Sequence, residues 1–279
     1  MAHRNAGADL PARRRGGARL SRRRAPERLP GIVDSHAHLQ HARFDADREA
    51  VLERAREAGV ERILVPGWDV ASSEAALDLA ARHPDLVDAA VGVHPHDVAA
   101  MDAAAWERLA QLAADPRTRA IGEIGLDYHR TVSPPGVQRD AFARQLSLAA
   151  ELGLPVLVHD REAHDDVTAA LLAHPGRGIL HAFSGDGAMA ARLVDAGFLV
   201  SFALPVAFRS AAGPREAATR LTDGTFLAET DSPYLGPDRD RRNEPTTVLR
   251  VVTELARLRG STPTAVALAI GDAYRSIIG

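Results

Sequence analysis

Two histidines separated by one residue, His36 and His38, are the most informative feature of the sequence. They follow Ile32 and Val33, a β-branched pair that is typical of the end of a buried strand. Residues i and i+2 of an extended chain point to the same face, so both imidazoles are directed to one point. This pattern favours a pair of ligands for a divalent metal, although two unrelated loop histidines would give the same spacing.

Other residues of ligand type follow one predicted strand after another. In a barrel of alternating strands and helices, the carboxyl ends of all strands meet at one mouth, where such enzymes hold their active sites. The candidates at these ends are His36, His38, His94, His96, Glu123, His159, His181, Glu229 and Asp231. So many imidazoles and carboxylates at separate strand ends predict a metal site at the mouth.

The order of the elements supports that arrangement. The predicted strands are 32–34, 62–65, 87–93, 120–124, 155–159, 178–181, 198–202 and 225–229. Helical patterns follow them at about 45–58, 72–82, 103–114, 136–152, 162–173, 187–196, 214–221 and 246–259, and a last helix covers about 263–277. Eight such units predict an α/β fold, the (β/α)8 TIM barrel, as a single domain over residues 31–279. A doubly wound open sheet is the alternative, but no glycine-rich phosphate-binding fingerprint follows the first strand.

Composition limits the chemistry of the site. The 279 residues contain no cysteine, so any metal must be held by His and carboxylate side chains. All 34 basic residues are arginine, which excludes a Schiff-base lysine and the carbamylated lysine that bridges two metals in many barrels. No apolar run approaches the ~18 residues of a membrane helix. We expect a cytoplasmic enzyme without membrane association or an obligate protein partner.

Charge divides the chain into two parts. Residues 1–30 carry nine Arg against Asp9 and Glu27, a net charge of +7, whereas residues 31–279 carry 25 Arg against 35 acidic residues, a net charge of −10. The Gly, Pro and Arg content of residues 1–30 predicts a disordered arm. Such an arm can neutralise nucleic-acid phosphates. An inert extension or a wrongly assigned start codon is the interpretation we favour.

Seven motifs, in order along the chain, resemble those of the TatD family of metal-dependent deoxyribonucleases, which are amidohydrolase-like barrels. They are DSHAHL at 34–39, GVHPH at 92–96, GEIGLDY at 122–128, VHDR at 158–161, HAFSG at 181–185, ETDSPYL at 229–235 and RNEP at 242–245. The resemblance extends from about Ile32 to Pro245, so residues 1–30 lie outside it and the last helix is less typical.

The resemblance implies two divalent cations held by six residues. The first cation would be held by His36, His38, Glu123 and Asp231, and the second by Glu123, His159 and His181. Glu123 would bridge them, and Asp231 would also accept a proton from bound water, so both are catalytic candidates. A donor set of His and carboxylate does not distinguish Zn²⁺, Mn²⁺, Co²⁺ and Mg²⁺.

Substrate contacts are implied for His94, His96 and Arg161. A guanidinium two residues beyond a ligand histidine is also placed to pair with a phosphate, and an exposed arginine at the start of a helix is the alternative for Arg161. Residues 242–245 are interpreted as a latch for the last loop, with a structural or a substrate-binding role.

The residues alone predict metal-assisted hydrolysis, and hydrolysis of a phosphodiester by a metal-bound hydroxide is the interpretation we favour. The resemblance implies a 3′–5′ exonuclease that acts on single-stranded ends of DNA. An esterase, an amidohydrolase or an aminoacyl-ester hydrolase on the same barrel is the alternative. A non-catalytic nucleic-acid-binding protein is more remote, because the ligand set is complete.

Overall fold

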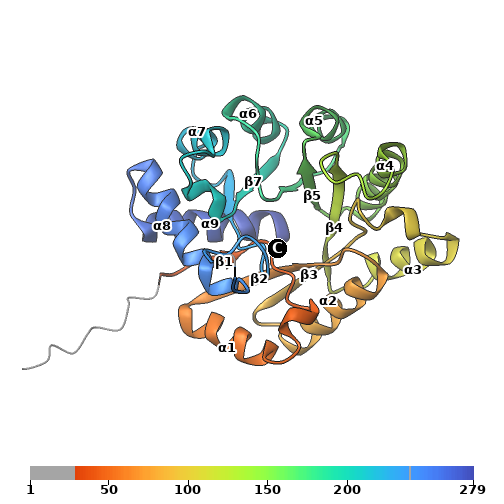
Figure 1. The fold of residues 1–279 in the computed structure, drawn as a ribbon, viewed down its shortest axis with the longest axis horizontal. Coiled ribbons are helices and arrows are strands. Elements are labelled where there is room, and N and C mark those ends of the chain that lie inside the picture. Colours follow the sequence, from red (N-terminus) through yellow and green to blue (C-terminus); the bar gives the residue numbers. More distant parts are fainter. Residues whose placement is uncertain (1–28, 239) are drawn as a thin grey trace, which may run out of the picture.

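The computed structural model describes residues 29–238 and 240–279, so nearly all of the predicted arm lies outside the described residues. Eight parallel strands form one sheet in sequential order (Figure 1). They are β1 (Ile32–Asp34), β2 (Val60–Pro66), β3 (Val87–Val91), β4 (Thr118–Asp127), β5 (Val156–Arg161), β6 (Gly178–Leu180), β7 (Phe198–Phe202) and β8 (Phe226–Ala228). The predicted single-domain (β/α)8 barrel is confirmed.

A helix follows each strand, and these helices surround the strands (Figure 1). They are α1 (Arg48–Ala58), α2 (Val70–Arg82), α3 (Ala103–Ala113), α4 (Pro135–Leu152), α5 (His164–Ala173), α6 (Gly187–Asp195), α7 (Ala212–Arg220) and α8 (Val248–Arg259), and α9 (Pro263–Ile278) ends the chain. Helices α1 and α4 end at Gly59 and Gly153, as predicted, because glycine adopts the left-handed backbone of a helix terminus without strain. In the part of the chain that the structure describes, no helix is long and apolar enough to cross a membrane.

Short 3₁₀ helices lie in several loops, and the last of them overlaps the start of the helix predicted at about 246–259. They are Ala42–Phe44, Val98–Ala100, Leu204–Ala207 and Pro245–Thr247. The first of these explains why α1 begins at Arg48, three residues later than predicted. Phe44 is fully buried in that turn, which separates the loop after β1 from the helix.

Strand β4 is longer than predicted and continues past Glu123 to Asp127. Glu123 therefore lies within the strand and not at its end. The extension is possible because Gly125, with φ +136°, lies against β5: a Cβ atom there would be 2.0 Å from the carbonyl oxygen of His159. The sheet register shifts between Ile121 and Ile124, on either side of Glu123.

The barrel closes where the first and last strands meet. Past the end of β1, the amide of His38 donates to the carbonyl of Ser232 at 2.7 Å, and the amide of Asp231 donates to the carbonyl of His36 at 2.9 Å. A parallel bridge pairs Ala37 with Ser232. These bonds place the segment that contains both N-terminal histidines beside the segment that follows β8.

Candidate metal centre

Four side chains converge where the segment after β1 lies beside the segment after β8. The Nε2 atoms of His36 and His38 lie 3.1 Å apart. The Oε2 atom of Glu123 is 3.5 Å from each of them, and the Oδ1 atom of Asp231 is 3.7 Å from each. Two donors that bind one tetrahedral cation at ~2.1 Å are separated by ~3.4 Å. The four atoms are therefore spaced like the ligands of one cation.

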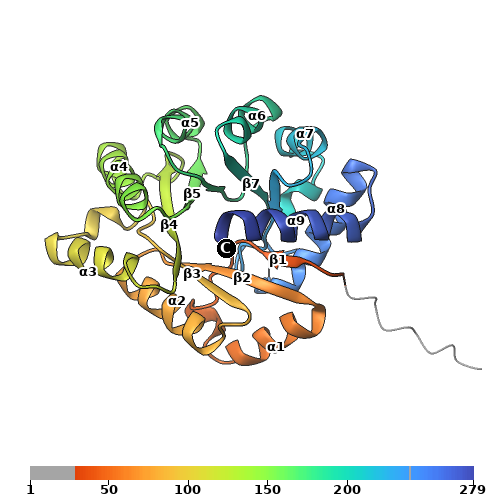
Figure 2. The same cartoon turned by 180° about the vertical axis from the view of Figure 1, so that it is seen from behind.

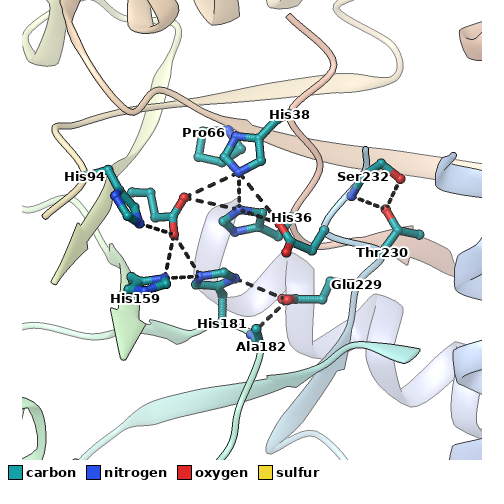
Figure 3. Close-up of polar contacts among 12 residues, drawn as sticks. His36, His38, Pro66, His94, His159, His181, Ala182, Glu229, Thr230 and Ser232 are labelled. Carbon is teal, nitrogen blue, oxygen red and sulfur yellow. Dashed lines mark hydrogen bonds and ion pairs between the residues drawn. The ribbon is translucent and has the colours of Figure 1, made fainter. Parts of the chain in front are cut away.

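The other carboxylate oxygen of Glu123 faces a second group of imidazoles, those of His94, His159 and His181, which Figure 3 labels. Its Oε1 atom lies 2.9 Å from Nε2 of His181, 3.0 Å from Nδ1 of His159 and 3.6 Å from Nε2 of His94. The two nearer nitrogens are 3.2 Å apart. Each oxygen of Glu123 thus belongs to a different group of donors.

A buried glutamate orients the ring of His181. The Oε1 atom of Glu229 lies 3.2 Å from Nδ1 of His181 and accepts the amide of Ala182 at 2.8 Å. In Figure 3 the ring of His181 lies between Glu229 and His159. A hydrogen bond at Nδ1 fixes the ring so that Nε2 faces Glu123, which is how carboxylates support metal-ligating histidines.

Burial and charge set the protonation of the cluster. Burial beside His36 lowers the pKa of His38 to about 3, so this ring is neutral at pH 7 and carries a lone pair for a cation. Burial alone would raise the pKa of Glu123, but the adjacent His181, His94 and His36 hold that pKa well below its usual range. Glu123 is consequently an anionic donor in the middle of the imidazoles.

The residues present fit divalent cations. The Nε2 atoms of His36 and His38 face each other, and burial lowers the pKa of both rings. Two such neutral rings share at most one proton between these atoms, whereas a cation satisfies both lone pairs. Among the described residues, three buried atoms of the cluster have no hydrogen-bond partner: His36 Nδ1, His38 Nδ1 and Glu229 Oε2. His159 Nε2 has only a long contact, 3.5 Å, with Oδ2 of Asp127. Since buried polar groups are normally paired, the cluster is not arranged as a self-sufficient hydrogen-bond network.

Asp231 has a backbone conformation that is uncommon for residues other than glycine, and this conformation orients its carboxylate. Its φ is +54°, in the left-handed region that Asp and Asn tolerate better than most residues. Its side chain makes no hydrogen bond within the described residues, and its close polar neighbours are His36 and His38. This conformation turns the carboxylate toward the first donor group.

The three residues predicted to contact substrate lie in different settings. His94 approaches Glu123, as described above. Nε2 of His96 donates to Oδ2 of Asp127 at 2.7 Å, and Asp127 also accepts the backbone amides of His129 and Arg130. Arg161 ends β5 as an exposed side chain on the pocket wall. The motif pair His94 and His96 is therefore divided between the cluster and the loop beside it.

A pocket of ≈ 580 Å³ opens over the cluster. Its lining includes Trp68, Tyr234, Arg130 and His41, none of which was among the predicted site residues. The signal was available for Trp68, because it lies two residues beyond the end of β2, a strand for which no candidate was named. The mouth is thus lined by both aromatic and cationic groups.

The predicted latch at residues 242–245 is an ion-pair network between the last loop and α1. The two terminal guanidinium nitrogens of Arg242 donate to the carboxylate of Asp47, at 2.6 and 2.8 Å. Glu244 accepts two hydrogen bonds from Arg54, each 2.9 Å long. Asn243 is buried, and its amide donates to the chain just before Asp231. These contacts favour the structural role, because they hold the loop that follows β8.

The comparisons with known proteins agree with this geometry. The model of the family "TatD related DNase" matches residues 33–279. An uncharacterized metal-dependent hydrolase of Bacillus subtilis, YabD, is 37% identical over 236 residues, which cover 83% of this chain and 92% of that protein. A protein of Dickeya dadantii named 3′-5′ ssDNA/RNA exonuclease TatD is 38% identical over 240 residues, 82% of this chain and 90% of that protein.

Solved structures give the same assignment. The crystal structure of YjjV, a TatD homologue from Escherichia coli K12, superposes with a TM-score of 0.83 at 30% identity and covers 88% of this chain and 97% of that one. The family model's match, residues 33–279, includes all of the residues that form the donor cluster. The chain belongs to the TatD family of metal-dependent hydrolases.

Proposed function

We propose that the chain is a two-metal phosphodiesterase that removes nucleotides from the 3′ end of single-stranded DNA or RNA. The observation that carries this proposal is the position of Glu123, whose two oxygens face two separate groups of donors. Two cations bridged by a carboxylate suit the in-line displacement at a phosphodiester, because they stabilise both the attacking and the leaving oxygen. The relative from Dickeya dadantii, named as an exonuclease, supports the choice of substrate.

Six side chains would hold the cations. The first group is His36, His38, Glu123 and Asp231, and the second is Glu123, His159 and His181. Bound there, divalent cations would supply Lewis acidity that activates water and neutralises charge developing on the phosphoryl oxygens. The chain offers no thiolate or lysine alternative.

The protein's own groups would complete the chemistry. The free carboxylate of Asp231 faces the first donor group and the pocket, where it accepts the proton of an attacking water. Arg161 and Arg130 line the same pocket and would pair with substrate phosphates. Because residues 31–279 carry a net charge of −10, attraction of a polyanion depends on such local groups.

The test is metal reconstitution. Protein stripped with a chelator is loaded with Zn²⁺, Mn²⁺, Co²⁺ or Mg²⁺ in turn, and the metal content is measured together with cleavage of single-stranded DNA, RNA, a small phosphodiester and an aminoacyl ester. We expect two equivalents of metal and release of mononucleotides from the 3′ end. One equivalent at full activity would contradict the bridging role, and cleavage of the aminoacyl ester alone would contradict the phosphodiesterase.

A pair of variants separates the bridge from general charge loss. Glu123→Gln removes the anionic bridge, so we expect fewer than two equivalents of metal and little cleavage. Glu162→Gln removes an exposed carboxylate that pairs with His129 near the mouth, and should keep both metals. Equal metal content in the two variants would exclude Glu123 as the shared ligand.

A further inference from the structure

One wall of the mouth pocket is made of three aromatic rings from three separate loops. His41 follows β1, Trp68 follows β2 and Tyr234 follows β8. The ring of His41 lies between the others, with centroids 6.0 Å from Trp68 and 5.9 Å from Tyr234. We call these three residues the aromatic wall. Segments from both ends of the barrel sequence therefore build one surface.

The aromatic wall directly adjoins the candidate metal centre. The ring of His38 lies 5.4 Å from Trp68 and 6.1 Å from Tyr234, measured between centroids. The amide of Tyr234 donates to the carbonyl of Asp231 at 2.7 Å, so the loop that holds this ring also holds a proposed ligand. A group resting on the wall is consequently adjacent to the reacting centre.

These rings are not part of the core. The sequence contains two Trp and three Tyr, and one of each lies on this wall. Tyr234 is 46% exposed, and neither its hydroxyl nor the indole nitrogen of Trp68 has a hydrogen-bond partner within residues 29–238 and 240–279. Large aromatic surfaces left open at a pocket are typical of recognition sites.

The pocket also carries positive charge beyond the rings. Arg130 and Arg161 are exposed side chains of its lining, and in the part of the chain that the structure describes neither guanidinium has an acidic partner. One pocket thus combines flat apolar surface with unpaired cations. A nucleic-acid strand presents the complementary pair of features, flat bases and anionic phosphates.

We propose that unpaired bases of the substrate strand stack on the aromatic wall while its phosphates pair with Arg130 and Arg161. This inference rests on the proposed function and adds to it the residues that select a single strand. Stacking needs the open face of a base, which a duplex covers with its neighbouring base pairs. A stacked base typically strengthens binding by about 5- to 150-fold, and it does so with little sequence preference.

Binding without turnover gives the first test. Trp106→Phe leaves Trp68 as the sole tryptophan, and chelation prevents cleavage. The fluorescence of Trp68 is then titrated with single-stranded oligodeoxythymidylate, with an abasic chain of the same length and with a blunt duplex. We expect quenching by oligodeoxythymidylate alone, because only unpaired bases reach the indole. Equal quenching by the abasic chain, or none by oligodeoxythymidylate, would overturn the inference.

Kinetics of the metal-loaded enzyme give the second test. We compare kcat/KM for an intact single strand with that for a strand whose last two nucleotides are abasic. The wild type should prefer the intact strand by about 10-fold or more, and Trp68→Ala or Tyr234→Ala should move that ratio toward one. Tyr234→Phe should restore the preference, because it keeps the ring. If both alanine variants keep the wild-type ratio, substrate bases do not stack on the aromatic wall and the inference is overturned.

A matched control uses an aromatic ring outside the pocket. Phe208 is 57% exposed and does not line this pocket, so Phe208→Ala should keep the wild-type ratio. If the wild type cleaves no phosphodiester, the proposed function fails and the fluorescence titration still decides the wall. If it cleaves strands with no preference for bases, the wall alone is rejected.

Discussion

The two ends of the barrel handle buried polar groups in opposite ways. At the amino-terminal end, α9 lies across the strands (Figure 2). The fully buried Tyr274 donates its hydroxyl to Asp88 at 2.8 Å, and the guanidinium of Arg62 pairs with the same carboxylate. At the mouth, by contrast, His36 and His38 turn ring nitrogens toward each other, and both rings keep a buried nitrogen without a partner among the described residues.

This contrast separates stability from function. At the amino-terminal end, which we call the closed end, the carboxylate of Asp88 accepts hydrogen bonds from both Tyr274 and Arg62, so these buried polar groups are paired and the hydrogen bonds stabilise the fold. At the mouth, like groups crowd together, an arrangement that proteins tolerate where catalysis needs it. Barrel enzymes in general place catalysis at the carboxyl ends of the strands and stability at the other end.

The largest effect is expected at the mouth. Asp231→Asn keeps the size of the side chain and tolerates the positive φ, but it removes the charge and the proton acceptor. We expect kcat to fall by ~10²-fold or more with little change in stability, because the carboxylate makes no structural hydrogen bond. Steady-state kinetics at saturating metal and chemical denaturation measure the two quantities.

Asp97→Asn is the control for Asp231→Asn. Asp97 lines the same pocket but contacts none of the clustered imidazoles, so its variant should retain most of the activity. Near-normal kcat for Asp231→Asn at saturating metal would mean that the proton acceptor is another group.

The closed end should show the reverse behaviour. Tyr274→Phe removes a buried hydrogen bond to a charged group and should lower the free energy of unfolding by about 1.5–3 kcal/mol. Burial beside Asp88 raises the pKa of Tyr274, so the phenol is a donor at every pH where the protein is used. Denaturation measures the loss, and kcat per folded molecule should not change.

Tyr128→Phe is the control for Tyr274→Phe, because it removes the same phenol hydroxyl from a different environment. Its hydroxyl contacts Asp166 on the exposed surface, so its removal should cost far less than that of Tyr274. Similar losses in the two variants would show that the buried pair is not what stabilises the closed end.

The ion pairs of the latch on the mouth side should stabilise the fold less than the buried hydrogen bond between Tyr274 and Asp88. Glu244→Gln removes the charge that pairs with Arg54 and Arg242, and should lower the free energy of unfolding by about 1 kcal/mol at low salt. Against the effect of burial, the two arginines lower the pKa of Glu244 from 4.5. The stabilisation is therefore complete above pH 4.5 and is lost as pH falls through the lower folded pKa.

Denaturation of wild type and Glu244→Gln between pH 3 and 8 checks this difference, and 1 M salt should reduce it. Glu107→Gln, an exposed carboxylate on α3, is the control without a latch partner. A difference that does not decrease at all as pH falls below 4.5 would exclude the ion pairs as its source.

The smallest effect concerns the start of α5. Nδ1 of His164 donates a hydrogen bond to the carboxylate of Asp160 at 2.8 Å, which raises the pKa of His164 above 6.5. Its stabilisation is complete below pH 6.5 and is lost as pH rises through the folded pKa, the opposite sign to that of Glu244. With the His164 side chain 40% exposed, we expect only a few tenths of a kcal/mol. His164→Gln should abolish this pH dependence in denaturation curves; an unchanged slope would contradict it.

The sequence determined which end of the barrel holds the chemistry. Alternation of apolar segments and helical patterns specifies parallel strands, and parallel strands bring their carboxyl ends together. His36, His38, His159, His181 and Asp231 were predicted to converge on these grounds, and the structure brings them together. Local periodicity is sufficient for this, because it fixes the direction of each strand and the side from which its terminal residues project.

Only the tertiary structure decided how individual side chains are divided at that end. His94 approaches Glu123 whereas His96 turns to Asp127, although the two share one motif. The aromatic wall and the latch join loops that are distant in sequence. Arg242, for example, contacts Asp47, which lies 195 positions before it. Loop conformations depend on long-range contacts of this kind, which residue spacing does not encode.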